Sequence, residues 1–454
     1  MTMPLLPAAF VRRITAQLGE DAAAYFAAMD KQPVRGLRAN PHKLSELPLP
    51  AYVPGFGDPV PWAAGSVYLA GDSPAGALPL HEAGAYYLQE PSAMLPATLL
   101  AVRPGETVLD LCAAPGGKST QLAAAMAATG TLVCNEPVPN RAQILSRNLE
   151  RMGVTHAVVV CADPAALADR WPLLFDAVMV DAPCSGEGMF RRHPETRLEW
   201  REDSPEHCAA RQLRILQSAL RMLKPGGRLV YATCTLSEAE NEGVIAALLA
   251  AHAELETVGF SVPIGGGRSL AAPDGQIRLY PHTVSGEGHF TALLRKTMPG
   301  ADDSAMSCPL LPPASALAAP GKALLDAYTD FCQSIPQGAM PLPNAALGDT
   351  LLAAPMLPPL DGIRVLRAGL SLGQVKGKVF APDHALAMAA PMPPLPRVAL
   401  DAAQAVCFQR GEALAYAGEQ RGFLLATYLG LALGFAKAND GLLKNHYPKG
   451  LRRP

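Results

Sequence analysis

Short apolar runs alternate with amphipathic stretches through the middle of the chain. Runs of the length of a strand buried on both faces occupy residues 107–111, 131–135, 157–161, 175–180 and 228–232. Apolar side chains recur at helical spacing over residues 139–152, 206–223 and 237–252. This alternation predicts an α/β fold with a doubly wound parallel sheet, in which polar residues gather where the strands end.

Two further local patterns predict a hairpin and a capped helix near the end of this region. Residues 276–280 and 290–294 are apolar runs separated by Gly286 and Gly288, so they predict a closing hairpin. Ser237 precedes an apolar periodic stretch and Glu240 follows three residues later, which predicts a helix that begins with a capping box.

The pattern changes on both sides of this central region. Residues 1–90 combine a helical stretch at 8–29 with proline-rich turns, and they predict a small α+β domain that precedes the sheet. The central domain would span residues 91–297. Residues 298–360 are rich in Pro and Ala, which indicates a linker or a small domain. Strand-like sequence returns at 362–367 and 422–429, so residues 361–454 predict a further domain.

Composition narrows the class of protein. The 454 residues are 49% hydrophobic and carry a formal net charge of −2, which excludes a basic coat over the whole surface but leaves room for a local basic groove. Basic residues cluster at Arg35, Arg38, His42 and Lys43, again at residues 191–193, and at the tail over 444–453. Each cluster is either an RNA contact or an ordinary solvated surface.

Cysteine usage and hydropathy exclude several other classes. Nine cysteines with no C-x-x-C pair indicate neither a disulfide framework nor a zinc site, so we expect no metal. The chain shows no signal peptide pattern and no apolar run near the ~20 residues of a membrane span. We therefore expect a cytoplasmic protein without a membrane partner.

A glycine turn follows the first predicted strand. Pro115-Gly116-Gly117-Lys118 lacks the spacing of the known phosphate-binding loops, which favours a nucleoside ligand without an essential pyrophosphate. Glu136 follows the second strand, where a carboxylate can accept hydrogen bonds from ribose hydroxyls, and Asp163 follows the third, within reach of an adenine amine. S-adenosylmethionine is the commonest ligand of this kind. The alternative for both carboxylates is a surface position that caps a helix.

Two cysteines end predicted strands of the same sheet. Cys184 follows Asp181-Ala-Pro183, and Cys234 follows Tyr231-Ala-Thr233. Isolated cysteines are usually small buried hydrophobic residues, which is a sufficient explanation for Cys112, Cys134 and Cys161. Two thiols at neighbouring strand ends beside a ligand site also fit a catalytic pair, and the residues alone leave both interpretations open.

Three motifs carry a family resemblance over roughly residues 90–296. Asp110-Leu-Cys-Ala-Ala-Pro-Gly-Gly-Lys-Ser119, Asp181-Ala-Pro-Cys-Ser-Gly-Glu-Gly188 and Tyr231-Ala-Thr-Cys-Thr235 resemble the motifs of RNA cytosine-C5 methyltransferases of the RsmB/NOP2/NSUN family. The stretches 380–388 and 444–452 are similar to the carboxyl-terminal region of bacterial RsmF-type enzymes, which methylate 16S ribosomal RNA.

The resemblance implies a Rossmann-like S-adenosylmethionine-dependent core and a PUA-like RNA-binding region near the carboxyl terminus. It implies that Cys234 is the nucleophile that adds to C6 of cytosine, and that Cys184 assists loss of the C5 proton and release. Asp181 would lie between cofactor and base, Glu136 on ribose and Asp163 on adenine. The methionine end of the cofactor would contact Cys112, Ala113, Ala114, Pro115, Gly116, Gly117 and Lys118.

Several further expectations accompany this assignment. Lys118 is a cation in the first turn of a helix, which is unfavourable and indicates a nearby carboxylate partner. The expected partner is ribosomal RNA or the small ribosomal subunit, and the expected state is a monomer. Three alternatives remain: a cytosine-C5 methyltransferase for tRNA or another rRNA, a non-catalytic ribosome-assembly factor, and a nicotinamide-dependent oxidoreductase.

Overall fold

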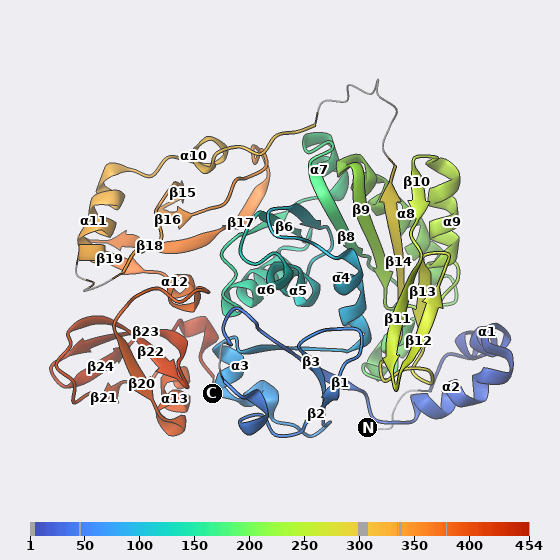
Figure 1. Ribbon diagram of the computed structural model, residues 1–454, viewed down its shortest axis with the longest axis horizontal. Helices are drawn as coiled ribbons and strands as arrows, with labels where there is room; N and C mark the ends of the chain where they lie inside the picture. Colours follow the sequence, from blue (N-terminus) through green and yellow to red (C-terminus); the bar gives the residue numbers. More distant parts are fainter. Residues whose placement is uncertain are drawn as a thin grey trace.

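The computed structural model describes residues 5–44, 47–297, 307–333, 335, 338–377 and 379–453. Its centre is a nine-stranded sheet with helices on both faces, and smaller sheets flank this unit on the amino-terminal and carboxyl-terminal sides (Figure 1). The first nine residues of the predicted linker, 298–306, lie outside the described residues.

The five predicted strands form the parallel part of the central sheet, in the spatial order β9-β8-β5-β6-β7. Their bounds are β5 (Thr107–Asp110), β6 (Thr131–Asn135), β7 (Ala157–Cys161), β8 (Phe175–Asp181) and β9 (Leu223–Thr233). The predicted hairpin is also present: β13 (Gln276–Leu279) pairs with β14 (His289–Lys296), and β14 pairs antiparallel with β9. The predicted doubly wound α/β fold is therefore confirmed.

Alternate side chains of each strand enter two separate cores. Leu109 and Val133 belong to one core, which Leu216 and Leu248 cover, while Val108 and Leu132 belong to the core on the opposite face. The helices of the first core are α7 (Pro164–Arg170), α8 (Ser204–Met222) and α9 (Glu242–Ala251). Those of the second are α4 (Leu95–Leu100), α5 (Gly117–Ala125) and α6 (Pro139–Arg151). Burial on both faces explains why the strands are apolar at consecutive positions.

The chain changes direction across this sheet at β5. It runs from β5 to β6 and β7 on one side, then returns to β8 and β9 on the other. Ligands of doubly wound sheets bind at such a switch point, outside the carboxyl ends of the strands. The glycine turn after β5, Glu136 after β6 and the Asp181–Cys184 segment after β8 all follow strands at this edge.

The predicted capping box at Ser237 is wrong. Helix α9 begins at Glu242, its N-terminal residue Asn241 makes no side-chain cap, and Ser237 and Glu240 lie in the preceding loop. The Glu240 carboxylate is turned instead toward the loop that follows β8, where it accepts hydrogen bonds from Ser185. Hydrogen bonds from Ser185, which is distant in sequence, have replaced the predicted capping pair of Ser237 and Glu240.

The described amino-terminal region contains the helices α1, α2 and α3 and a four-stranded sheet in the order β2-β3-β1-β4. The single helix expected over 8–29 is divided at Gly19, where φ is 55°, a left-handed value that suits glycine. The elements are α1 (Ala8–Leu18), α2 (Ala22–Met29), β1 (Arg35–Ala39), β2 (Phe56–Pro59), β3 (Ser66–Leu69), the short helix α3 (Pro79–Glu82) and β4 (Tyr86–Gln89).

Two cations of the predicted Arg35–Lys43 basic cluster are structural groups and not a solvated loop, with Arg38 buried and Lys43 half-buried. Arg38 is 4% exposed, and its guanidinium donates to the Gly117 carbonyl at 3.1 Å and to the Thr120 hydroxyl at 2.7 Å. The Lys43 ammonium donates to two backbone carbonyls at 2.9 and 3.0 Å, and burial lowers its pKa to about 7. Both side chains connect the amino-terminal domain to the central one.

The Pro/Ala-rich region forms ordered structure where it is described. It contains α10 (Pro313–Ala316), α11 (Lys322–Gln333), β15 (Ala345–Leu347) and β16 (Thr350–Ala353). A four-stranded sheet joins β15 and β16 to β18 (Leu370–Lys376) and β19 (Val379–Pro382). Strands from both sides of residue 360 share this sheet, so the expected domain boundary there does not coincide with a structural break.

Strand β17 (Arg364–Ala368) leaves this region and pairs antiparallel with β7 at the edge of the central sheet. It covers the edge that β7 would otherwise expose, which removes an open template for strand pairing between molecules. The strand-like pattern at 362–367 is therefore confirmed as a strand, but it belongs to the central sheet.

The last region contains a five-stranded sheet in the order β20-β22-β23-β24-β21 and two helices (Figure 1). The elements are α12 (His384–Met388), β20 (Arg397–Leu400), α13 (Ala402–Arg410), β21 (Leu414–Ala415), β22 (Gly422–Tyr428), β23 (Leu431–Asn439) and β24 (Leu442–Asn445). In the basic tail, the Arg453 guanidinium pairs with Glu82 at 2.7 Å and donates to the Ala77 carbonyl at 2.6 Å. The Arg453 guanidinium thus binds groups of the amino-terminal region.

The remaining described strands extend the other edge of the central unit. Strand β10 (Leu255–Thr257) pairs with β14, while β11 (Phe260–Gly265) and β12 (Arg268–Ala272) form a hairpin of their own. Among the described residues, no helix combines the length and the apolar composition that a bilayer crossing requires.

Candidate active site

The glycine turn after β5 is held both by contacts close in sequence and by a contact from α6. Gly116 has φ 110°, a conformation that favours glycine, and it directly precedes α5. The Ser119 hydroxyl donates to the buried Asp110 carboxylate at 2.6 Å, and the Asn148 amide donates to the Pro115 carbonyl at 2.8 Å. We call this turn, together with Glu136 and Asp163, the glycine-turn half of the site.

The two predicted nucleoside-binding carboxylates both reach the cleft beside this turn. Glu136 is buried, accepts a hydrogen bond from the Val138 amide at 3.0 Å and lies 3.3 Å from Arg141. Asp163 accepts from the Ala165 amide at 2.8 Å and so caps α7 while it lines the cleft. One Asp163 oxygen therefore caps the helix, as the alternative interpretation expects. The predicted ligand contact would use the second oxygen.

The expected carboxylate partner of Lys118 is Asp181. The Lys118 ammonium is nearly buried and lies 2.8 Å from the Asp181 carboxylate, so it joins α5 to the end of β8. His289 of β14 lies on the other side, with its Nε2 3.8 Å from Asp181. Burial, assisted by the Lys118 charge, holds the pKa of His289 well below its usual range, so this ring is neutral at pH 7.

The two predicted thiols lie next to each other. The sulfur atoms of Cys184 and Cys234 are 3.3 Å apart, and both residues line the same cleft as Glu136 and Asp163. The hydrogen bond with Cys234 raises the pKa of Cys184 well above its usual value, and burial adds to the effect. Both effects favour the neutral thiol form of Cys184. We call the segments 181–188 and 233–240 the thiol half of the site.

The cleft has a volume of about 610 Å³, which suits a ligand of nucleoside size. Of the predicted site residues it is lined by Cys112, Ala114, Glu136, Asp163, Asp181, Cys184 and Cys234. The turn residues Ala113, Pro115, Gly116, Gly117 and Lys118 lie outside this lining. Arg211 and Arg214, which the sequence analysis did not single out, line the cleft from α8 and are exposed.

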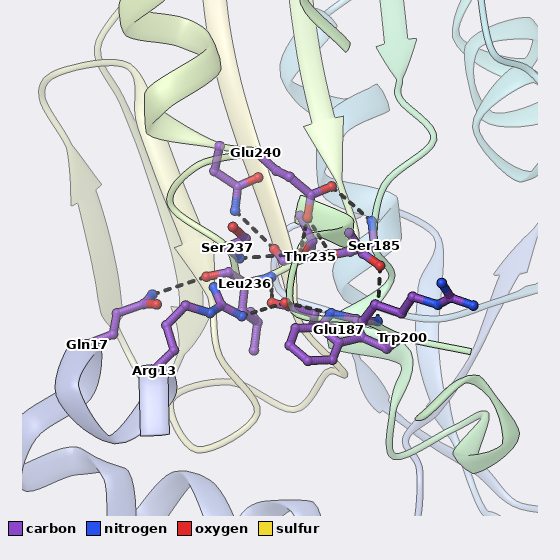
Figure 2. A network of polar contacts seen from close by, with 12 residues as sticks. Arg13, Gln17, Ser185, Glu187, Trp200, Thr235, Leu236, Ser237 and Glu240 are labelled. Carbon is purple, nitrogen blue, oxygen red and sulfur yellow. Dashed lines mark hydrogen bonds and ion pairs between the residues drawn. The ribbon is translucent and has the colours of Figure 1, made fainter. Parts of the chain in front are cut away.

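Two buried carboxylates that sequence reasoning missed support the thiol half (Figure 2). Glu187 accepts from the Trp200 indole at 3.1 Å and the Leu236 amide at 3.3 Å, and it pairs with Arg13 of α1. Glu240 accepts from the residues that follow each thiol, as described below. Glu187 lies inside the Asp181–Gly188 motif, which is a signal that could have identified it, whereas the spacing of Glu240 pointed to the wrong partner.

The predicted RNA-channel role of residues 191–193 fails for Arg191. Its guanidinium is buried and binds the Glu287 carboxylate at 2.7 Å and the carbonyls of Ala28 and Gly286 at 2.8 Å. Arg192 donates to the Val34 carbonyl at 3.1 Å. Both arginines connect the loop to the amino-terminal region.

Metal-ligating side chains are not grouped in the part of the chain that the structure describes. No group of three or more His, Cys, Asp or Glu side chains there has a metal-binding arrangement. The nine cysteines are all free thiols.

Four family models match successive parts of the chain. They are described as 16S rRNA methyltransferase RsmB/F (residues 97–295), the N-terminal domain of 16S rRNA methyltransferase RsmF (6–91), the RsmF rRNA methyltransferase first C-terminal domain (330–389) and the methyltransferase RsmF PUA domain (395–453).

Relatives and solved structures agree with these matches. The ribosomal RNA small subunit methyltransferase F of Klebsiella pneumoniae is 31% identical and covers 94% of this chain and 92% of its own; that of Erwinia tasmaniensis is 31% identical, with 98% and 97% covered. A methyltransferase homolog from Pyrococcus horikoshii superposes with a TM-score of 0.55 at 31% identity, covering 63% of this chain and 94% of its own. NSun6 from the same organism, solved with SFG, gives 0.56 at 21% identity, covering 64% and 99%.

The doubly wound sheet and its cleft thus define the chain as a Rossmann-like methyltransferase with a PUA domain at its carboxyl end. Within that class it belongs to the RsmB/F family of 16S ribosomal RNA methyltransferases, with the domain composition of RsmF. The family resemblance of the three motifs is confirmed, and the oxidoreductase alternative is wrong.

Proposed function

We propose that this protein methylates C5 of a cytosine in 16S ribosomal RNA, with S-adenosylmethionine as the methyl donor, through a covalent bond between Cys234 and C6 of the base. The observation that carries the proposal is the pair of sulfur atoms 3.3 Å apart in the cleft that also holds Glu136 and Asp163. A single structural cysteine needs no second thiol at this position, whereas a pair can supply both the nucleophile for addition and a group that assists release.

The cleft fits the donor. Glu136 is a carboxylate that lines the cleft and suits ribose hydroxyls, and Asp163 would offer its second oxygen to an adenine amine. When bound, S-adenosylmethionine supplies a methyl group on a positively charged sulfur, which is the electrophile that a C5 nucleophile requires.

The two thiols would divide the chemistry between them. The Cys234 thiolate adds to C6, which makes C5 nucleophilic. After C5 carries the methyl group, Cys184 assists removal of the C5 proton, and the C6–sulfur bond breaks to release Cys234. The raised pKa of Cys184 supports its exclusion as the nucleophile, because a neutral thiol adds poorly to C6.

Asp181 would hold the polar edge of the base. Its carboxylate lies in the cleft between the glycine turn and the thiols, and Lys118 fixes it at 2.8 Å. A base can reach this position only after it leaves its stack, which costs a few kcal/mol and is cheapest in single-stranded or loosely paired RNA.

Thiol variants test the chemistry. We expect Cys234→Ala to abolish transfer of labelled methyl groups from S-adenosylmethionine to ribosomal RNA. Cys184→Ala should accumulate a protein–RNA adduct that survives denaturation, because addition proceeds while release stalls. Cys407→Ala, in the carboxyl-terminal domain, is the matched control and should behave as wild type.

Two results would contradict the proposal. Turnover by Cys234→Ala would show that this thiol is not the nucleophile, and normal turnover by Cys184→Ala without adduct would remove its role in release. A non-catalytic assembly factor would bind RNA with no methyl transfer from any variant.

The substrate is tested in parallel. Naked 16S ribosomal RNA, small ribosomal subunits and tRNA are offered to the same enzyme, and bisulfite sequencing identifies any 5-methylcytosine. Modification of tRNA alone would favour the alternative substrate.

A further inference from the structure

One buried carboxylate contacts both thiol-bearing segments. Glu240 has no exposed surface, and its Oε2 accepts from the Ser185 amide and from the Gln212 side-chain amide, both at 2.9 Å. Its Oε1 accepts from the Thr235 hydroxyl at 3.0 Å and from the Ser185 hydroxyl. Ser185 directly follows Cys184 and Thr235 directly follows Cys234, so the carboxylate joins the two residues that come after the thiols (Figure 2).

The contacts around Glu240 reinforce this connection. The Ser185 and Thr235 hydroxyls lie 2.8 Å apart, and Gln212 of α8 also donates to the carbonyl of Pro183, the residue before Cys184, at 3.0 Å. The backbone on both sides of Cys184 is therefore held from Glu240, on one side directly and on the other through Gln212.

The loop that carries Glu240 is itself fixed to the sheet. The Tyr231 hydroxyl donates to the Glu240 carbonyl at 2.6 Å, and the Thr233 hydroxyl donates to Asn241 at 2.6 Å. The Asn241 amide donates in turn to the Thr235 carbonyl at 3.0 Å. A rigid strand end thus determines where the carboxylate lies, and the carboxylate determines where the two thiol segments lie.

Burial of a carboxylate is costly unless every oxygen is satisfied, and burial raises the pKa of Glu240. The partners of Glu240 fall into two kinds. Oε2 faces two N–H groups, which can only donate, whereas Oε1 faces two hydroxyls, which can donate or accept. A glutamine could therefore keep every contact, with its oxygen toward the N–H groups and its amino group toward the hydroxyls.

We propose that Glu240 is a positioning residue that sets the separation of the Cys184 and Cys234 sulfur atoms through Ser185 and Thr235. It touches neither base nor donor, and its charge is not required. This inference rests on the proposed division of the chemistry between the two thiols.

The test compares Glu240→Gln, Glu240→Ala and the control Glu242→Ala. Glu242 is a half-exposed carboxylate two residues away that pairs with Arg278 outside the cleft. Glu240→Gln should keep kcat within a fewfold of wild type, because its contacts can be retained. Glu240→Ala should lower kcat on the order of 100-fold, with KM for S-adenosylmethionine unchanged, because four hydrogen bonds are lost on the thiol side only. Glu242→Ala should match wild type.

A second readout does not depend on methyl transfer. Diamide removes one hydrogen from each of two neighbouring thiols and leaves a disulfide, so the rate of Cys184–Cys234 disulfide formation, followed by peptide mass, reports their separation. We expect wild type, Glu240→Gln and Glu242→Ala to form this disulfide at similar rates and Glu240→Ala to form it at least tenfold more slowly.

These readouts separate the possible failures. If Glu240→Gln lost as much activity as Glu240→Ala while its thiols still paired with diamide, the charge would act directly and the positioning role would be wrong. Unchanged disulfide formation and kcat in Glu240→Ala would also overturn it. If wild type methylated no cytosine, the proposed function would fail while the diamide result still stood. Should Glu240→Ala not fold, Thr235→Val removes one contact at nearly constant volume, and it should slow disulfide formation and turnover by a smaller factor.

Discussion

The two halves of the cleft are held together in different ways. The glycine-turn half depends on contacts short in sequence, such as Ser119 with Asp110, nine residues apart, and the Thr120 hydroxyl with the Gly116 carbonyl, four apart. The thiol half depends on contacts that span 55 residues from Ser185 to Glu240 and 174 residues from Arg13 to Glu187. One half is largely a local structure, and the other exists only when distant segments meet.

This difference predicts which kinetic quantity a substitution in each half should change. A change in the glycine-turn half should affect donor binding, and a change in the carboxylates behind the thiols should affect turnover. Arg38 qualifies the contrast, because it reaches the glycine turn from the amino-terminal domain. The following predictions test the comparison in order of decreasing effect on methylation.

The largest effect is expected at Lys118, which joins the two halves. Lys118→Met leaves Asp181 without its cation at 2.8 Å, so both KM for S-adenosylmethionine and kcat should deteriorate, with kcat/KM lowered on the order of 100-fold or more. Lys224→Met removes a similar ion pair, with Asp176 at 2.7 Å, remote from the cleft, and is the control for steady-state kinetics. Constants within twofold of wild type in Lys118→Met would remove its bridging role.

Glu136→Gln should affect the glycine-turn half alone. The loss of a charged acceptor for ribose hydroxyls should weaken S-adenosylmethionine binding by about 10- to 100-fold, while kcat at saturating donor stays within a few-fold of wild type. Calorimetric titration of the donor and steady-state kinetics measure the two quantities. Glu106→Gln, which disturbs the pair with Arg228 elsewhere, provides the comparison; equal donor affinity in both variants would refute the ribose assignment.

Arg13→Met should affect the thiol half alone. The variant leaves the buried Glu187 carboxylate without its cation, so kcat should fall by about 3- to 10-fold with unchanged donor affinity. Arg12 is a matched neighbour whose side chain is 70% exposed, against 32% for Arg13, and which pairs with Glu202 at 3.7 Å. Arg12→Met should therefore leave kcat as in wild type. A similar loss in both variants would indicate a general effect of α1.

The smallest effect on turnover is expected at Asp110. There the pH dependence of folding stability is the quantity to measure. Burial, with a smaller contribution from the Asp181 charge, raises the pKa of Asp110 from 3.8 to about 7. Between about pH 4 and pH 7 the unfolded chain has lost this proton and the folded protein keeps it, so the residue lowers stability progressively as pH rises. Asn cannot titrate but can still accept from Ser119.

The melting temperature of Asp110→Asn, relative to wild type, should consequently rise by a few degrees as pH increases through this window. Thermal unfolding at several pH values measures it. A difference that is constant with pH would show that Asp110 is ionised in the folded protein.

The central strands could be predicted because burial on two faces leaves a continuous apolar run. Residues 131–135 and 157–161 were delimited from sequence with the bounds of β6 and β7. The strands then placed Cys184 and Cys234 at one edge, and a parallel sheet brings such ends together. That part of the site followed from pattern and topology.

The roles of the charged residues could not be predicted in the same way. Arg38, Lys43 and Arg191 are basic residues for which the sequence predicts a surface position, yet each binds carbonyls or a carboxylate of another segment, and Arg38 and Arg191 are buried. Glu240 matched a local helix-capping pattern, but Ser185 and Gln212 offered it donors that the local sequence does not have. The identity of a residue specifies its charge but does not specify which residue it pairs with.

The sequence by itself determined the α/β architecture, the switch-point edge and the positions of the two thiols, because these depend on hydrophobic periodicity and on residues adjacent to strand ends. Only the tertiary structure decided how the thiols are held at 3.3 Å, which carboxylates hold the loops behind them and which cations are buried. Those features depend on hydrogen bonds and ion pairs between residues 50 to 174 positions apart, whose partners are chosen only when the whole chain has packed.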